Sequence, residues 1–282
     1  MLTLVESLSL AGDRAKQNDD TFGLNGSAAW AIDGATDLHE TPLTRWASDA
    51  SWIAQFANTR FQSEAIAADA HALRDVVRRA SSAAAHAFAD LAGGLPEEHW
   101  RLPLASLLMA AETDDGVVGL DLGDCRLFAL EEAGRAHAIG GPPDAANNES
   151  KLAAKAAADA GEAPLLRHAP TLDLLRRGRD KQNRPGGSWA FCTLPQCADE
   201  ARVWRLPLTR PAHLLLCTDG FSALVDRYGD YDAGSLVSGA LGRGLQELGR
   251  ELREIENDDS SGAKHPRWKR SDDATALLLR LT

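Results

Sequence analysis

The chain has 282 residues, of which 44% are hydrophobic, so it can bury a sizeable core and is not a disordered protein. Its formal net charge of −11 argues against nucleic acid as the main partner, because binding phosphates requires a dense basic surface. No apolar run reaches the ~18 residues of a membrane span. The four cysteines lack metal-binding spacing and indicate reduced thiols. We therefore expect a cytoplasmic, monomeric protein that binds neither nucleic acid nor a membrane.

The N-terminal third mixes strands with helices. Short apolar and alternating runs predict strands at residues 2–10, 22–24 and 27–34. Thr41 as N-cap and Pro42 at the first helical position predict that a helix begins there and continues to about residue 61. An alanine-rich helix is expected over about 67–91, ending before Gly93.

The middle of the chain turns to strands and then changes in character. Three apolar runs at 104–112, 116–123 and 125–130 predict an antiparallel meander. Residues from about 140 to 187 are rich in Ala, Arg and Lys with few large apolar residues, which favours a helical insertion that covers something. We expect one domain over residues 1–282 that carries this insertion.

The C-terminal part returns to strands and ends on one. Strands are expected at residues 188–194, 201–206, 213–217 and 274–281. An amphipathic helix follows Cys217 at once, and a long helix is expected over about 236–255. Two antiparallel sets of strands with helices after each indicate an α+β fold, an αββα sandwich of two antiparallel sheets flanked by helices.

Aspartates stand at or beside strand ends at five separate places in the chain. They are Asp19 with Asp20, Asp33, Asp124, Asp219, and Asp272 with Asp273. Taken singly, each also fits a turn or a helix cap. If they converge, their charges persist only when protonated or neutralised by cations, and an all-oxygen set suits Mg²⁺ or Mn²⁺. Two such ions ~4 Å apart would clamp a phosphate and activate a water, which is the chemistry of phosphate-ester hydrolysis.

Five motifs in order along the chain resemble the type-2C, metal-dependent (PPM) Ser/Thr protein phosphatases in their bacterial form. The motifs are NDD (18–20), AIDGAT (31–36), GLDLGDCRLFAL (119–130), LLLCTDGFSALVD (214–226) and DDATALLLRL (272–281). The resemblance spans nearly the whole chain and implies an αββα sandwich with two Mn²⁺ or Mg²⁺ ions, and a phosphorylated protein as substrate.

The resemblance assigns metal ligands residue by residue. They are Asp33, Gly34, Asp219, Asp272, and Asp19 or Asp20 for the family's acidic pair. Asp33 would bridge both ions, and Gly34 would bind through its carbonyl oxygen. A metal-bound water held by Asp33 and Asp219 would attack phosphorus. Asp124 matches the acid that helps to hold a weaker third ion in bacterial members.

The phosphate-binding arginine of the family is harder to place. It stands five positions before the second acid of the pair, which is Arg14 if that acid is Asp19 and Ala15 if it is Asp20. In an extended segment Arg14 and Lys16 would point to the same face, so either could hold the substrate. We favour Arg14, because a guanidinium binds phosphate in a bidentate fashion.

Other positions depart from the family or border its cleft. Ala35 stands where many eukaryotic members have a proposed histidine acid, and His39 nearby is expected to be a surface histidine beside a helix start. The insertion occupies the place of the family's variable flap. The basic run 264–270 precedes Asp272 and could steer phosphate toward the cleft.

These observations predict a metal-dependent hydrolase of phosphoserine or phosphothreonine in proteins. Two alternatives remain open: a weakly catalytic pseudophosphatase that acts as a binding module, and a phosphatase for small phosphorylated metabolites. Loops typical of P-loop nucleotide hydrolases, serine esterases and HExxH zinc proteases are absent from the sequence.

Overall fold

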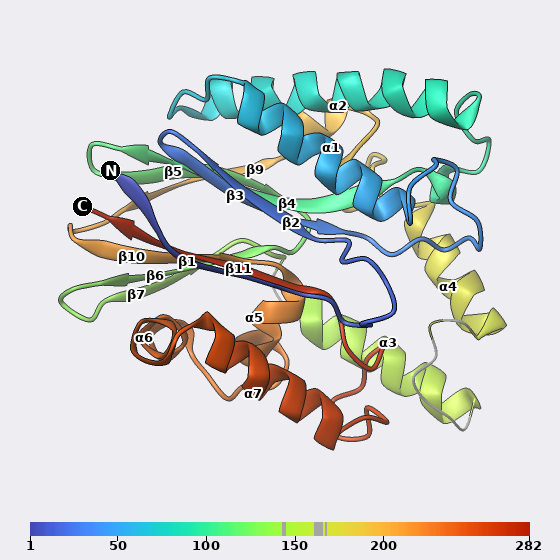
Figure 1. The fold of residues 1–282 in the computed structure, drawn as a ribbon. Helices are drawn as coiled ribbons and strands as arrows, with labels where there is room; N and C mark the ends of the chain where they lie inside the picture. Colours follow the sequence, from blue (N-terminus) through green and yellow to red (C-terminus); the bar gives the residue numbers. More distant parts are fainter. Residues whose placement is uncertain (143–144, 161–165, 167) are drawn as a thin grey trace.

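The computed structural model describes residues 1–142, 145–160, 166 and 168–282. Two antiparallel sheets pack face to face, with helices on both outer faces (Figure 1). The predicted αββα sandwich is therefore confirmed. Among the helices of the described residues, none combines the length and apolar character required to cross a bilayer.

Each sheet gathers strands that are distant in sequence. The first has the order β1 (Leu2–Leu10), β11 (Ala274–Leu281), β10 (Ala212–Cys217), β6 (Arg126–Glu131) and β7 (Ala136–Ile139). The second has the order β2 (Thr21–Asn25), β3 (Ala28–Gly34), β4 (Leu104–Thr113), β5 (Gly116–Leu122) and β9 (Arg202–Pro207), with β8 (Phe191–Cys192) paired to β4.

The helices form two outer layers and a group at one end of the sandwich (Figure 1). The second sheet is covered by α1 (Asp49–Ser63) and α2 (Ala70–Ala92), and the first by α5 (Asp219–Asp226), α6 (Ala233–Arg243) and α7 (Leu245–Asp258). The expected insertion contains α3 (Ala145–Ala160) and α4 (Ala169–Arg179). Short 3₁₀ turns, η1 (His99–Arg101) and η2 (Pro195–Ala198), complete the elements. Parts of that insertion, residues 143–144, 161–165 and 167, lie outside the described residues.

The central strands are apolar on both faces because both faces are buried. In β10, Leu214 and Leu216 point between the sheets, while Leu215 and Cys217 point toward the helices of the outer layer. This follows from the alternation of side chains along a strand. Burial of both faces explains why the sequence of β10 is an almost continuous apolar run.

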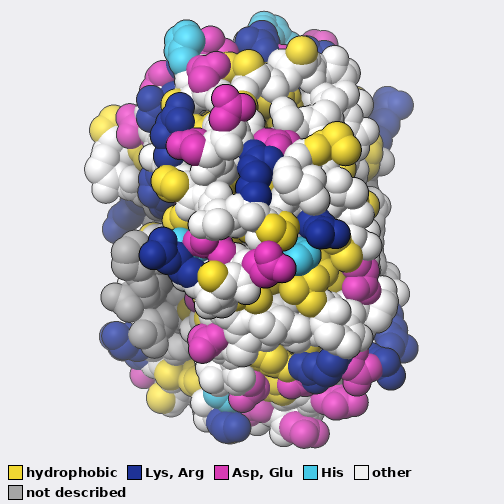
Figure 2. All heavy atoms as spheres, turned by 90° about the vertical axis from the view of Figure 1, so that its left-hand side faces the viewer, with side chains coloured by type: hydrophobic (Ala, Val, Ile, Leu, Met, Phe, Trp, Pro, Cys, Tyr) yellow, Lys and Arg dark blue, Asp and Glu magenta, His cyan; other side chains and the backbone are white. Residues whose placement is uncertain are grey.

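The strand directions bring every acidic motif to one end of the sandwich. β3, β5 and β10 end there, while β2, β6 and β11 begin there, as the antiparallel registers require. The two termini lie at the opposite end, where Leu2 pairs with Leu281. Figure 2 views that opposite end, which carries acidic, basic and apolar side chains intermingled.

Three predictions about local structure were wrong. Helix α1 begins at Asp49, with Ser48 as N-cap, and not at Thr41. The three middle strands do not form one meander, because β4 and β5 pair in one sheet while β6 pairs with β10 in the other. The expected long helix over 236–255 is two helices that are separated at Gly244, whose φ of 87° does not continue a helix. By contrast, α2 ends as expected, with Gly93 in the left-handed conformation.

Candidate metal centre

Asp33 and Asp124 are joined through the second sheet. Asp33 lies at the end of β3 and pairs in register with Ser106 of β4. The hydroxyl of Ser106 donates a hydrogen bond to Asp124 Oδ1 at 2.6 Å. Asp124 itself follows β5, in the turn that crosses to the other sheet. Two acids almost one hundred positions apart therefore meet through one strand.

Asp20 and Asp219 are joined across the two sheets. Asp219 is the first residue of α5, and Thr218 before it donates a hydrogen bond from Oγ1 to Asp20 Oδ2 at 2.7 Å. The same hydroxyl accepts a hydrogen bond from the backbone N–H of Thr275 at 3.0 Å. Asp20 is 4% exposed and Thr218 is fully buried. Thr218 thus fixes three chain segments at the edge of the acidic group.

The neighbouring residues Asp272 and Asp273 make different contacts. Asp273 accepts backbone N–H bonds from Gly12 at 2.7 Å and from Asp19 at 2.6 Å, so it holds the loop that follows β1. Asp272 instead binds the ammonium of Lys269, Nζ to Oδ1, at 2.6 Å. Asp273 is therefore a structural tie, while Asp272 faces charged groups.

Two glycines let the backbone pack tightly around the acids. A Cβ on Gly34 would lie 2.5 Å from the carbonyl oxygen of Asp19, and a Cβ on Gly220 would lie 2.0 Å from that of Asp273. Both distances are shorter than any normal contact. The glycines after Asp33 and Asp219 therefore have a packing reason, since the segments that bear the acids could not otherwise approach each other.

The electrostatics show that these carboxylates crowd one another. Burial raises the pKa of Asp33 well above its usual range, and the charges of Asp20 and Asp219 raise it further. Burial also raises the pKa of Asp20, and Asp219 reaches a pKa of about 7 through burial and the charge of Asp272. Burial opposes ionisation of Asp272 too, but the Lys269 ammonium outweighs it and keeps that pKa below its usual range.

This donor set fits hard divalent cations. It offers carboxylate oxygens from five chain segments. Burial and the neighbouring negative charges raise the pKa of Asp20, Asp33 and Asp219, and a bound cation would offset both effects. Oxygen-only sites of this kind suit Mg²⁺ or Mn²⁺.

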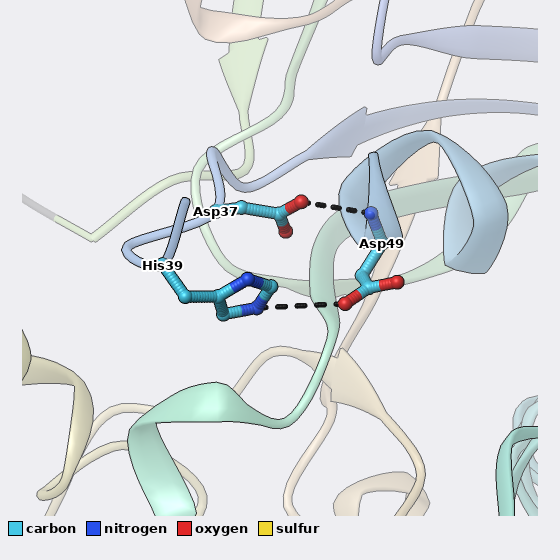
Figure 3. Close-up of side chains that lie close together, drawn as sticks. All are labelled: Asp37, His39 and Asp49. Atoms are coloured by element: carbon cyan, nitrogen blue, oxygen red, sulfur yellow. Dashed lines mark hydrogen bonds and ion pairs between the residues drawn. The ribbon is translucent and has the colours of Figure 1, made fainter. Parts of the chain in front are cut away.

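A second group of side chains that could ligate a metal ion lies at the start of α1: Asp37, His39 and Asp49 (Figure 3). Its oxygens are already engaged. Asp49 accepts hydrogen bonds from the backbone N–H groups of Leu43 and Thr44, at 2.7 and 2.8 Å, and Asp37 accepts one from the N–H of Asp49 at 2.8 Å. We therefore interpret this group as a structural lock.

The lock also places His39. Its Nε2 lies 3.4 Å from Asp49 Oδ2 and its Nδ1 lies 3.0 Å from the carbonyl oxygen of Thr41. The side chain is only 8% exposed, so the expectation of a surface histidine was wrong, although it does lie beside the start of α1.

Arg14 and Lys16 lie in a turn and not in an extended segment. The N–H of Lys16 donates to the carbonyl oxygen of Asp13 at 3.0 Å, which closes the turn. Both basic side chains are exposed, and the Lys16 ammonium lies 3.9 Å from the Asp13 carboxylate, which is also exposed. Asp19, the other member of the acidic pair, accepts a hydrogen bond from the hydroxyl of Ser48.

Sequence reasoning missed three charged residues near the acids. Lys269 belongs to the basic run 264–270, but nothing in the sequence indicates that this lysine in particular contacts Asp272. Glu149 of α3 pairs with Arg227, which follows α5, at 2.8 Å. Burial raises the pKa of Glu149, and the charges of Asp272 and Asp124 raise it further. Helix α3 therefore lies near the acidic group. Nothing in the sequence distinguishes Glu149 from glutamates on the exposed faces of other helices.

No family model matches the sequence, and no curated protein matches it. Solved structures do match. The PPM Ser-Thr phosphatase MsPP from Mycobacterium smegmatis is 15% identical, with 99% of this chain and 100% of that chain covered and a TM-score of 0.57. This chain has the PPM phosphatase fold.

Two further structures with this fold give the same picture. The serine/threonine phosphatase PstP/Ppp from Mycobacterium tuberculosis is 16% identical, with 99% of this chain and 98% of that chain covered and a TM-score of 0.57. The catalytic domain of PstP in complex with two manganese ions is 15% identical, with 99% of both chains covered and a TM-score of 0.56. The PPM fold therefore accounts for the chain from end to end.

Proposed function

We propose that this protein is a Mn²⁺- or Mg²⁺-dependent phosphatase that hydrolyses phosphoserine or phosphothreonine in proteins. One observation carries the proposal: acids from five chain segments converge at one end of a PPM fold, where burial and then the neighbouring carboxylates raise the pKa of Asp20, Asp33 and Asp219. Perturbed carboxyl groups gathered in this way are typical of functional sites. The two manganese ions of the PstP structure support the same chemistry.

The residues divide into roles under this proposal. Asp33, with Gly34, would hold both ions, and Asp219 and Asp272 would complete the set from the first sheet. Asp20 would serve for the family's acidic pair, because its side chain is among these acids while Asp19 binds Ser48. Asp124 would serve a third, weaker ion.

When bound, the ions would activate a water and offset the negative charge that develops on the phosphoryl group. The chain itself would contribute the carboxylates that hold the ions. Two of its residues near the site bear on the source of the proton for the leaving group. Ala35 carries no proton donor, and His39 directs both ring nitrogens at Thr41 and Asp49. We therefore expect the proton for the leaving group to come from neither residue.

We further propose that residues 1–282 form one domain and that the 140–187 segment acts as a flap beside the site. Helix α4 supports this because it docks on the loop after Asp33 and Gly34. Arg176 donates to the carbonyl oxygen of Leu38 at 2.7 Å and stacks 4.4 Å from the ring centroid of Trp100.

The test is phosphate release from a phosphothreonine peptide and from p-nitrophenyl phosphate, with Mn²⁺ and with EDTA. We expect metal-dependent hydrolysis of the peptide that is lost in Asp219→Asn and retained in Asp90→Asn, which changes an exposed carboxylate of α2. Hydrolysis of the small ester alone would favour the metabolite phosphatase. A folded protein that binds Mn²⁺ but hydrolyses neither substrate would favour the pseudophosphatase.

A further inference from the structure

The ammonium group of Lys269 contacts the acidic cluster at Asp272. Lys269 Nζ is 2.6 Å from Asp272 Oδ1, and the two side chains are 30% and 32% exposed. Asp33 and Asp219 are also close enough to raise the pKa of the lysine, after Asp272. Lys269 therefore contacts one proposed metal ligand and faces two others.

The segment that carries Lys269 is firmly anchored. Arg267 is buried, pairs with Asp259 at 2.8 Å, and donates to the carbonyl oxygen of Arg270 at 2.9 Å. Trp268 is 9% exposed and packs against side chains of α3 and α4. The backbone N–H of Leu166 donates to its carbonyl oxygen at 3.1 Å. Lys269 thus stands between fixed neighbours, unlike a lysine on a mobile surface loop.

The phosphoryl group of a phosphoserine or phosphothreonine substrate carries nearly two negative charges, so a protein cation beside the metals would strengthen its binding. Arg14 and Lys16 lie in an exposed turn, with Lys16 beside Asp13. Lys269 already lies among the acids that would hold the metals.

We propose that Lys269 is the residue that binds the phosphoryl group of the substrate; this rests on the function proposed above. If divalent cations bound at Asp272, they would share its carboxylate charge and would repel the ammonium of Lys269. The flexible stem of lysine would then let the three N–H donors turn from Asp272 to the phosphoryl oxygens. In the metal-free protein the same ammonium neutralises Asp272.

The test compares Lys269→Met, which keeps the apolar stem, with Lys269→Arg, which keeps the charge. Arg270→Met is the matched control, because this neighbouring guanidinium is exposed and binds Asn257 at 2.9 Å. Calorimetry would measure Mn²⁺ affinity, then the affinity of the Mn²⁺-loaded protein for inorganic phosphate. Steady-state kinetics on a phosphothreonine peptide would follow.

In Lys269→Met we expect phosphate affinity to fall about 10- to 100-fold, the usual effect of losing a charged hydrogen bond. Mn²⁺ affinity should be equal or higher, because a competing cation is gone. Lys269→Arg should restore phosphate binding, and Arg270→Met should leave both affinities unchanged.

Unchanged phosphate affinity in Lys269→Met would overturn the proposal, and so would a parallel loss of Mn²⁺ binding, which would mean that the lysine only supports the fold. A loss of phosphate affinity in Arg14→Ala with none in Lys269→Met would return the role to Arg14. Wild-type protein that binds Mn²⁺ and phosphate without hydrolysis would refute the proposed function alone, because the binding data still decide the role of Lys269.

Discussion

Replacing Asp219 by Asn should stabilise the metal-free protein while removing its response to metal. In the fold, burial and the charge of Asp272 raise the pKa of Asp219 from an ordinary value of 3.8 to about 7. An acid with a raised folded pKa weakens the folded state as pH rises through the window between those values. At pH 8 the full penalty is present, and it amounts to roughly 4 kcal/mol as an upper bound.

One effect opposes this gain. Asp219 lies in the first turn of α5, where a carboxylate favours the helix by about 0.3–1 kcal/mol. The repulsion is larger, so we expect a net gain of about 3 kcal/mol at pH 8. For a chain of this size that raises the melting temperature by about 6 °C.

The assay is thermal and urea unfolding of wild type and Asp219→Asn in EDTA between pH 5 and 8. The gap should shrink to about half by pH 5, because Asp219 is then protonated in the folded wild type. Added Mn²⁺ should stabilise the wild type but not the variant. Asp90→Asn should change stability by less than about 0.5 kcal/mol at any pH. A variant that is no more stable than wild type at pH 8 would refute the claim of crowded, unneutralised carboxylates.

Three further predictions follow from contacts in and near the site. Mn²⁺ affinity, measured by calorimetry, should fall by up to about tenfold per pH unit below 7, because Asp219 must lose its proton to bind metal; a flat profile would contradict its raised pKa. Arg267→Met should cost about 2–3 kcal/mol in urea unfolding, since Asp259 loses its buried ion pair and keeps only the backbone N–H bonds of Lys264 and His265, and a loss under 1 kcal/mol would show that water replaces the pair. Gly220→Ala should cost about 2 kcal/mol despite the helical preference of alanine, because its Cβ would lie 2.0 Å from the carbonyl oxygen of Asp273; unchanged stability would mean that the backbone yields freely.

The parts of this structure that the sequence predicted are those governed by local rules. Gly93 ends α2 through a left-handed conformation, and the apolar run before Asp219 forms a buried strand followed at once by a helix. The sequence also allowed for a convergence of the acids, because strand ends in antiparallel sheets can meet at one end of a sandwich. Each acidic motif lies at or beside the end of a predicted strand.

The errors have a common cause, which is that contacts distant in sequence override local signals. Thr41 and Pro42 resemble a helix start, yet the side chain of Asp49 binds the backbone of residues 43 and 44 and delays the helix. A short apolar run predicted β6 as a strand but could not identify the strand that pairs with it. The turn at Gly123, with φ of 86°, carries the chain into the other sheet.

Lys269 shows the same limit within the site. Its sequence neighbours mark a basic loop, and only the fold shows that one of its four basic side chains from Lys264 onward reaches Asp272 while Arg267 is buried as a structural tie. The same limit applies to the insertion. Helix α3 places Glu149 near the acids, and no sequence pattern predicts this position.

The most direct test of the account is a crystal structure grown with Mn²⁺ and phased so that the anomalous signal of manganese locates each ion. We predict two ions among Asp33, Asp219, Asp272 and Asp20, with the Lys269 ammonium turned away from Asp272. Manganese found instead at Asp37, His39 and Asp49, or at no ordered site in the loaded protein, would contradict the central claim that the converging acids form the metal centre.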